Sequence, residues 1–300
     1  MRLLILTQKV AKNDPVLGFF HRWIKEFAKN FEKVTVICLE KGGYSLPANV
    51  SVLSLGKEDT MIYHSVLRRL YYICRFYKYI WQERKNYDAV FVHMNQEYIL
   101  LGWKFWKLWG KKIYLWRNHA KGNILTDLAV LLSHKVFCTS PSSYTARFKK
   151  TKLMPVGIDT EFFKPDPAVL RRPNSILFLG RIAPVKKVLE FIDWVKSTAY
   201  TATIAGPILS EDRKYGEEVK RKLNDKIKLI GPVSQAEARK LYQSHETYAN
   251  FTPAGSMDKT VFEAAASGAK LEVRNPDLKN VRVEDHSLTL LMQKLAEEMK

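Results

Sequence analysis

The sequence predicts an α/β protein built from two Rossmann-like domains in tandem. Three observations support this class: short apolar runs alternate with amphipathic segments, the alternation stops once and restarts, and 300 residues are enough for two hydrophobic cores. Strands that alternate with helices form parallel sheets, because each crossover helix returns the chain to the same edge. The interruption falls at 158–174, where three prolines and mixed charges are typical of a linker.

The first half contains six short apolar runs that we expect to be strands. Their length and β-branched content suit strands buried on both faces of a sheet. A polar loop at 8–14 and an amphipathic helix at 19–31, which Gly18 opens, separate the first two runs. In chain order, the expected strands are 3–6, 34–39, 50–55, 89–93, 112–115 and 135–139.

The second half repeats the alternation without repeating the sequence. Its expected strands are 175–179, 202–205, 226–230, 248–251 and 270–273, and its expected helices are 186–198, 235–244, 260–267 and 287–300. The expected organisation is an N-terminal domain at 1–160, a linker at 161–174, a second domain at 175–284 and a C-terminal helix at 285–300 that crosses back to the first domain. Open α/β sheets bind ligands at the carboxyl ends of their strands, so we expect the ligand there.

The composition indicates which kinds of partner the protein binds and in which cellular compartment it works. The formal net charge is +19 and the isoelectric point is near 9.7, which favours a polyanionic partner. The three cysteines are odd in number and widely spaced, which fits neither a disulfide framework nor a zinc knuckle and indicates a reducing compartment. No run has the length and apolarity of a signal peptide or a membrane span. We expect a cytoplasmic protein, either soluble or peripheral on the inner face of the cell membrane.

One strand-to-helix turn in the second half has the residues of a phosphate site. The strand at 175–179 ends at Gly180, which is followed by Arg181 and, at the expected helix start, by Lys186. Arginine presents a fork of donors to phosphate oxygens, lysine adds a compact charge, and the amides of a helix start add a favourable dipole. The alternative is an ordinary solvated loop, in which basic residues are common.

A second segment, 248–268, leads from a strand through a Pro/Gly/Ser loop into an alanine-rich helix. Glu263 lies inside that helix, where its carboxylate can accept hydrogen bonds from two vicinal hydroxyls, such as those of a ribose. The alternative is that this glutamate is simply a good helix former.

Together these motifs resemble the family-4 glycosyltransferases of the GT-B fold, also called group 1 glycosyltransferases. The motifs that carry the resemblance are Gly180-Arg181 with Lys186 five positions later, Ala205-Gly206-Pro207, Ile230-Gly231 and FEAAASG at 262–268. Segments 17–23, 90–102 and 154–165 are also similar to that family, so the resemblance covers nearly the whole chain. It implies two Rossmann-like domains that face each other across a cleft.

The resemblance also implies an activity and a set of contacts. It implies a retaining, hexosyl-type transfer from a nucleotide-diphosphate sugar to a glycan or lipid-linked acceptor, in surface polysaccharide or glycolipid synthesis, with no metal ion or cofactor. Arg181 and Lys186 then hold the diphosphate, and Glu263 holds the ribose. His119 lies near the transferred sugar, although a loop or core histidine is the alternative. Further implied donor contacts are Gly18 beside the phosphates and Gly206, Pro207, Pro232 and Val233 beside the base.

The donor loop departs from the family pattern. That family often has two glutamates eight positions apart, but the residue eight positions before Glu263 is Gly255. The loop reads GSMDK at 255–259 and resembles a subgroup with an Asp-Lys pair. Because a glutamate is missing and the segment after Gly268 is short, a protein that binds nucleotide sugars without transferring them is the alternative function.

Within this loop, Asp258 is the candidate to hold sugar hydroxyls, and the alternative is that it only caps the following helix. A carboxylate so close to a diphosphate needs a counter-charge, which we expect from Lys259 or Arg181. The remaining candidates for donor contacts in the loop are Gly255, Ser256 and Lys259.

Two segments, 61–87 and 103–112, are rich in both basic and aromatic residues. One explanation is a pair of helices that face the core and carry a basic outer side, and another is an amphipathic surface for anionic lipid. Basic and aromatic residues also interleave in nucleic-acid binders, but no nucleic-acid motif is present and this partner is not favoured. The expected partners are a nucleotide-sugar donor, a glycan or lipid-linked acceptor and an anionic membrane surface.

Overall fold

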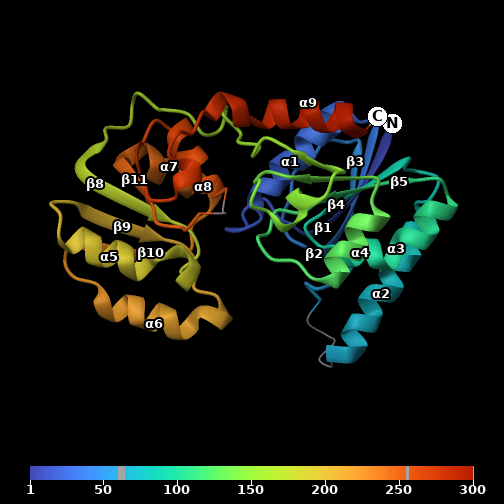
Figure 1. Ribbon diagram of the computed structural model, residues 1–300, viewed down its shortest axis with the longest axis horizontal. Coiled ribbons are helices and arrows are strands. Elements are labelled where there is room, and N and C mark those ends of the chain that lie inside the picture. The colour runs from blue at the N-terminus through green and yellow to red at the C-terminus, as the bar shows by residue number, and fades with distance from the viewer. Residues whose placement is uncertain (60–64, 255–256, 300) are drawn as a thin grey trace. The chain divides into compact units, whose positions relative to one another are not determined.

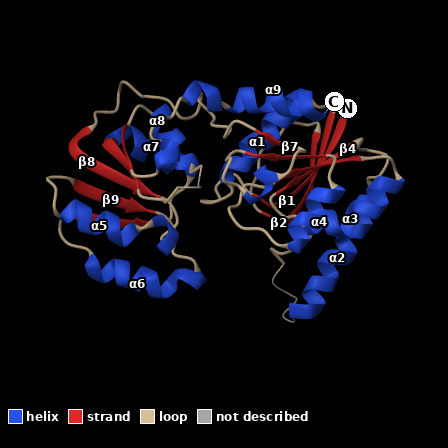
Figure 2. Ribbon diagram, viewed as in Figure 1, coloured by secondary structure: helices blue, strands red, loops and turns tan. Residues whose placement is uncertain are grey.

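The computed structural model describes residues 1–59, 65–254 and 257–299. The chain forms two compact units, Met1–Met154 with Leu291–Lys300, and Pro155–Leu290. Each unit is built on one parallel sheet with helices packed against it (Figures 1 and 2). The predicted α/β class with two Rossmann-like sheets is confirmed. The units meet in sequence at Met154 and Pro155, a few residues before the predicted boundary at 160.

The first sheet has seven strands in the order β3-β2-β1-β4-β5-β6-β7. They are β1 (Arg2–Val10), β2 (Lys33–Lys41), β3 (Val50–Ser54), β4 (Ala89–His93), β5 (Lys112–Trp116), β6 (Lys135–Cys138) and β7 (Thr151–Leu153). The predicted loop at 8–14 was wrong at its start, because Lys9 and Val10 continue the pairing of β1 with β2. Strand β7 was not predicted, since three residues at a sheet edge carry too little apolar pattern.

Two sets of helices cover this sheet. Helix α1 (Gly18–Asn30) connects β1 to β2, whereas α3 (Glu97–Leu108) and α4 (Ile124–Leu132) connect strands in the opposite direction along the sheet. Because such crossovers are right-handed, α1 covers one face, and α2 (Ser65–Gln82), α3 and α4 lie side by side on the other (Figure 1).

The C-terminal helix α9 (Leu288–Met299) belongs for most of its length to this first unit. The Tyr114 hydroxyl donates to the Met299 carbonyl at 2.8 Å, and Lys135 Nζ lies 2.9 Å from Glu298 Oε2.

The second sheet has five strands in the order β10-β9-β8-β11-β12. They are β8 (Arg172–Leu179), β9 (Thr201–Ala205), β10 (Ile227–Gly231), β11 (His245–Asn250) and β12 (Lys270–Val273). The helices are α5 (Val188–Lys196), α6 (Arg213–Lys222), α7 (Gln235–Ser244) and α8 (Lys259–Ala266). The chain turns away from β8 toward β9 on one side and reaches β11 on the other, so the topological switch point lies between β8 and β11.

Three expectations for this unit need correction. Strand β8 begins at Arg172, inside the predicted linker. Helix α5 begins at Val188 and not at 186, because Pro184–Lys186 forms a 3₁₀ turn and Lys187 takes a left-handed conformation with φ of 54°. Helix α6 was missed because seven of the ten residues in its sequence, RKYGEEVKRK, are charged and only Tyr215 and Val219 carry large apolar side chains.

Among the residues that the structure describes, no helix combines the length and the apolar character needed to cross a bilayer.

Candidate functional site

The carboxyl edge of the second sheet has a glycine at the end of each of three neighbouring strands: Gly180 after β8, Gly206 after β9 and Gly231 at the end of β10. Backbone hydrogen bonds link these turns. The Gly180 amide donates to the Ala205 carbonyl at 3.0 Å, and the Gly206 amide donates to the Gly231 carbonyl at 2.7 Å. The ends of β10, β9 and β8 therefore form a continuous backbone floor, which reaches the switch point only at β8. Ligands of such sheets bind at the carboxyl ends of the strands, beside the switch point.

Gly206 cannot be replaced at this floor without strain. Its φ is 144°, and a Cβ atom added there would lie 1.8 Å from the Gly180 carbonyl oxygen. By contrast, an added Cβ at Gly231 would meet no atom within 4 Å. The neighbouring Pro207 accepts a hydrogen bond from the Ile182 amide at 2.9 Å, which fixes the loop after β8 against the loop after β9. Val233 lies half-buried against the core of this unit.

Lys186 and Asp258 form an ion pair beside this floor. Lys186 Nζ lies 2.5 Å from Asp258 Oδ2, and the Asp258 side chain is only 9% exposed. Asn250 Nδ2, at the end of β11, donates to the same oxygen at 3.0 Å, and Thr260 Oγ1 donates to Oδ1 at 2.9 Å. Burial by itself raises the pKa of Asp258, but the Lys186 charge and these hydrogen bonds outweigh it and lower the pKa below its ordinary value.

This pair corrects two expectations about Asp258. Lys186, which was not expected as its counter-charge, forms an ion pair with Asp258, because the turn after β8 brings this lysine to the start of α8. Asp258 also occupies the N-cap position of α8, but its side chain makes no capping hydrogen bond there. The carboxylate is already bonded to Lys186, Asn250 and Thr260. Simple helix capping therefore does not explain this residue.

Glu263 lies in the same polar cluster. Its side chain is buried, with the residue only 3% exposed, and Oε2 accepts a hydrogen bond from the Tyr242 hydroxyl at 3.2 Å. The Tyr248 hydroxyl belongs to the same cluster, since it lies 2.6 Å from Thr260 Oγ1 and 3.1 Å from the Leu179 carbonyl. Burial, together with the nearby Glu263 and Asp258 carboxylates, raises the pKa of the Tyr242 hydroxyl well above its ordinary value. The ribose contact that the resemblance implies for Glu263 stays a prediction.

Arg181 points to different carboxylates. Its Nη1 lies 3.7 Å from Glu211 Oε1 and its Nε lies 3.7 Å from Asp212 Oδ2. Both acids belong to a short 3₁₀ turn, Ser210–Asp212, that precedes α6. The Arg181 side chain is 40% exposed. The two cations predicted to hold a diphosphate therefore come from one loop but pair with carboxylates from two different elements.

The other donor-loop residues divide into two groups. Lys259 is the first residue of α8 and is half-buried. Gly255 and Ser256 lie outside the described residues.

The predicted residues of the first unit follow its strands at the carboxyl edge. Gly18 is buried and begins α1, and its amide donates to the Asp14 carbonyl at 3.0 Å. His119 is exposed in the loop after β5, with Nδ1 2.9 Å from the Lys121 carbonyl. His93 was not a candidate, yet it ends β4 at the same edge, stacks on Phe20 at a centroid distance of 4.0 Å and lies 3.3 Å from Thr7 Oγ1.

Sequence reasoning also missed Tyr242, Tyr248, Asn250 and Thr260. Asn250 carried a usable signal, because it ends a strand beside the donor loop. The two tyrosines look like ordinary core residues until their hydroxyls are located. Across residues 1–59, 65–254 and 257–299, no three His, Cys, Asp or Glu side chains are grouped to hold a metal ion.

Two open parallel sheets in separate units are the architecture of the GT-B fold. Solved structures of glycosyltransferases share it along the whole chain. HepE from Anabaena, in complex with UDP and glucose, is 16% identical, with a TM-score of 0.70 over 100% of this chain and 95% of that one. AviGT4, a glycosyltransferase involved in avilamycin A biosynthesis, is 12% identical, with a TM-score of 0.71 over 99% and 96%.

The same fold also serves a different reaction. UDP-GlcNAc 2-epimerase from Methanocaldococcus jannaschii is 13% identical, with a TM-score of 0.56 over 98% of each chain. No protein-family model and no curated protein sequence matches this chain. At these identities the likeness establishes the fold, and the reaction has to be argued from the site.

Proposed function

We propose that this protein is a glycosyltransferase that moves a sugar from a nucleotide-diphosphate donor to a glycan or lipid-linked acceptor. The observation that carries the proposal is the Lys186–Asp258 pair at the glycine floor of the second sheet. A backbone floor without side chains lets a diphosphate approach closely, and a lysine beside it supplies charge. The complex of HepE with UDP and glucose supports a ligand of this chemistry for this fold.

In the proposed reaction, the bond between the anomeric carbon and the diphosphate oxygen breaks while the acceptor hydroxyl adds to the same face. Negative charge grows on the leaving phosphate, so Lys186 and Arg181 stabilise the transition state more than the ground state. The leaving phosphate takes the acceptor proton. No metal ion is required for this scheme, because the two cations supply the compensating charge.

Asp258 has a positioning role in this proposal. It holds Lys186 through a short contact, while Asn250 and Thr260 fix the carboxylate itself. A diphosphate then meets a lysine that is already oriented, and reorganisation costs little. The resemblance further assigns Gly18 to the donor phosphates and His119 to the transferred sugar, with the reaction in surface polysaccharide or glycolipid synthesis at the inner face of the membrane.

A second candidate function is nucleotide-sugar binding without transfer. The observation that favours it is that Asp258 and Glu263 are both buried and bonded to protein groups, which leaves fewer carboxylate oxygens for a sugar.

A transfer assay separates the two functions. The protein is mixed with UDP-, GDP-, dTDP- and ADP-sugars, and release of free nucleoside diphosphate is measured with and without membrane extracts as the acceptor source. Release that depends on the acceptor, and that falls in His119→Ala while donor binding persists, supports transfer. Donor binding with no release under any condition supports the binding protein.

A further inference from the structure

The outer surface of helices α2, α3 and α4 is unusually apolar. The described residues include sixteen large apolar side chains that are exposed, and nine of them lie on these three helices. Soluble proteins rarely gather exposed apolar side chains in this way unless the surface binds something. We call this surface the α2–α4 face. Its nine exposed apolar residues are Val66, Leu67, Leu70, Trp81, Leu108, Ile124, Leu125, Leu128 and Leu131.

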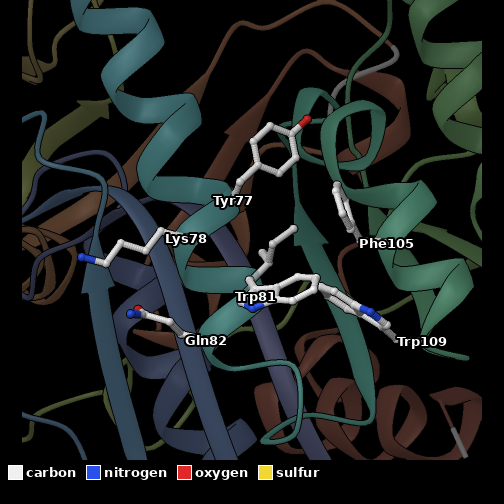
Figure 3. A pocket seen from close by; sticks show the side chains of 7 residues that line it. Tyr77, Lys78, Trp81, Gln82, Phe105 and Trp109 are labelled. Carbon is white, nitrogen blue, oxygen red and sulfur yellow. The ribbon is translucent and has the colours of Figure 1, made fainter.

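An aromatic pocket opens in this face between α2 and α3. Its volume is about 420 Å³, within the range of small-molecule sites. Four rings line it (Figure 3): Tyr77 lies 5.6 Å from Phe105, Phe105 lies 5.6 Å from Trp109, and Trp109 lies 5.7 Å from Trp81. The lining is almost entirely carbon, which suits a hydrocarbon chain better than a sugar or a nucleotide.

Lys78 lines the pocket, and further cations lie along the two helices that form it. Helix α2 contains no acidic residue, and Lys78 and Lys104 are exposed on α2 and α3. Arg84 lies over the Trp81 ring at 4.6 Å, and Lys104 Nζ lies 5.6 Å from the centre of the Trp103 ring. Tryptophan with lysine or arginine at the edge of an apolar surface is the composition of segments that lie in a membrane interface.

The same charges disfavour a second copy of this chain as the occupant. A symmetric dimer through α2 and α3 would bring the lysines and arginines of these helices against those of the second copy, and like charges would meet across the interface. An anionic lipid surface presents the opposite charge to the cations and acyl chains to the pocket.

The pocket is also separate from the carboxyl edge of its own sheet, where the proposed site residues of this unit lie. Helix α2 leads into β4 and α3 leads into β5, so the C-terminal turns that line the pocket lie at the amino ends of those strands. His93 ends β4, and Gly18 and His119 follow the carboxyl ends of β1 and β5. An acceptor sugar would be placed at that opposite edge, so this pocket serves for attachment and not for the reaction.

We propose that the α2–α4 face binds an anionic phospholipid bilayer and that the aromatic pocket takes up one acyl chain. This inference says which surface attaches the protein to the membrane. It rests on the proposed function only for the lipid-linked acceptor. Lipid attachment itself can be measured without any sugar transfer, so the two proposals can fail separately.

The test is co-sedimentation of the full chain with vesicles of phosphatidylcholine alone and of an equimolar mixture with phosphatidylglycerol. We expect binding to the mixed vesicles and little to phosphatidylcholine alone. The double variant Lys78→Glu/Lys104→Glu should weaken binding at least about tenfold, because each reversal removes one attraction and adds one repulsion. The control, Lys214→Glu/Lys226→Glu, changes the net charge equally at exposed positions of the second unit and should bind like the native protein.

Bromine atoms placed on the acyl chains test the pocket directly, since they quench tryptophan on contact. Quenching should fall clearly in Trp81→Phe and stay unchanged in Trp194→Phe of the second unit. Three results would overturn the proposal. They are no binding to the mixed vesicles, an equal loss of vesicle affinity in both charge-reversal variants, and quenching that is the same in Trp81→Phe as in the native protein. The proposal would also be overturned if the native protein were a dimer and the variant Lys78→Glu/Lys104→Glu a monomer. Calorimetry with nucleoside diphosphates on the same samples reports the proposed function independently.

Discussion

Lys186 Nζ and Asp258 Oδ2 lie 2.5 Å apart although 72 residues separate them in the chain. The pair joins the turn after β8 to the start of α8, at the switch point of the second sheet. The lysine is 21% exposed and the aspartate 9%, so the pair is largely removed from water. A lysine held this way lies beside the glycine floor and cannot move freely. In the proposed complex, an incoming diphosphate would share Lys186 with the Asp258 carboxylate.

Removing the carboxylate should destabilise the second unit. In Asp258→Ala the Lys186 charge loses its partner in a largely buried site, and breaking such a pair costs about 3–5 kcal/mol. The matched control is Lys222→Ala, which breaks the exposed pair with Asp193 at 2.9 Å and should cost no more than about 1 kcal/mol. Amide hydrogen exchange in β8 and β11 measures the local stability of this unit alone. Equal protection factors in the two variants would contradict a structural role for the pair.

Acid should destabilise the second unit through His245. Burial first, and then the Arg172 charge, lower the pKa of His245 to about 4. The geometry agrees, since Nδ1 lies 2.8 Å from the Leu241 carbonyl while Nε2 faces the Arg172 guanidinium at 2.6 Å, which requires a neutral ring. The unfolded chain binds the proton near pH 6.5 and the folded chain only near pH 4, so stability is full above 6.5 and falls as the pH drops.

The loss across this window should reach about 3 kcal/mol at pH 4. This loss of stability can be measured by hydrogen exchange in β11 between neutral pH and pH 4, with the rates corrected for intrinsic exchange. His245→Gln should flatten the profile, whereas His119→Gln, at an exposed position, should leave it unchanged. A profile that is the same in native protein and His245→Gln would show that another group is responsible.

The glycine floor can be tested by two alanine substitutions. Gly206→Ala places a Cβ 1.8 Å from the Gly180 carbonyl, so the turn must shift, at a cost of about 1–3 kcal/mol. Gly231→Ala has open space and only the strain of its φ of 76°, about 1 kcal/mol. We expect Gly206→Ala to lose nucleoside-diphosphate affinity and Gly231→Ala to retain most of it, as measured by calorimetry. Similar affinities in both would mean that the floor does not contact the ligand.

Glu263 offers a test that separates ribose from phosphate. If its carboxylate holds the ribose, Glu263→Gln should weaken binding of a nucleoside diphosphate by about 1.5–3 kcal/mol. Binding of inorganic pyrophosphate, which has no ribose, should not change. Tyr242→Phe removes the hydroxyl that donates to Glu263 at 3.2 Å and serves as the control for a purely structural loss. Equal weakening of both ligands in Glu263→Gln would remove this residue from the ribose contact.

The sequence predicted the elements whose pattern is local. Residues 89–93 and 235–244 match β4 and α7, because one is an unbroken apolar run and the other begins with a Ser-x-x-Glu capping box. Helix α6 escaped prediction because seven of its ten residues are charged, so Tyr215 and Val219, which pack against the core, were not recognised as one face of a helix. Arg181 and Lys186 could be proposed because they are basic residues in a strand-to-helix turn, and Gly206 because the family resemblance implies it.

The partner of Lys186 could not be predicted. Asp258 stood beside Lys259 in sequence, and nothing in the spacing indicates that a turn 72 residues earlier supplies its counter-charge. The buried hydroxyls of Tyr242 and Tyr248 depend in the same way on how α7, α8 and β11 pack together. Contacts of this kind are set by tertiary structure, so only coordinates reveal them.

The central claim is that the carboxyl edge of the second sheet binds a nucleoside diphosphate through Arg181 and Lys186. The most direct measurement is a thermal-shift panel of UDP, GDP, dTDP and ADP on native protein, followed by calorimetry of the best ligand with Arg181→Ala and with the exposed control Lys196→Ala. We predict that one of the four raises the melting temperature and that Arg181→Ala loses about 1.5–3 kcal/mol of binding while Lys196→Ala loses almost none. No stabilisation by any of the four, or the same affinity in Arg181→Ala and Lys196→Ala, would contradict the claim.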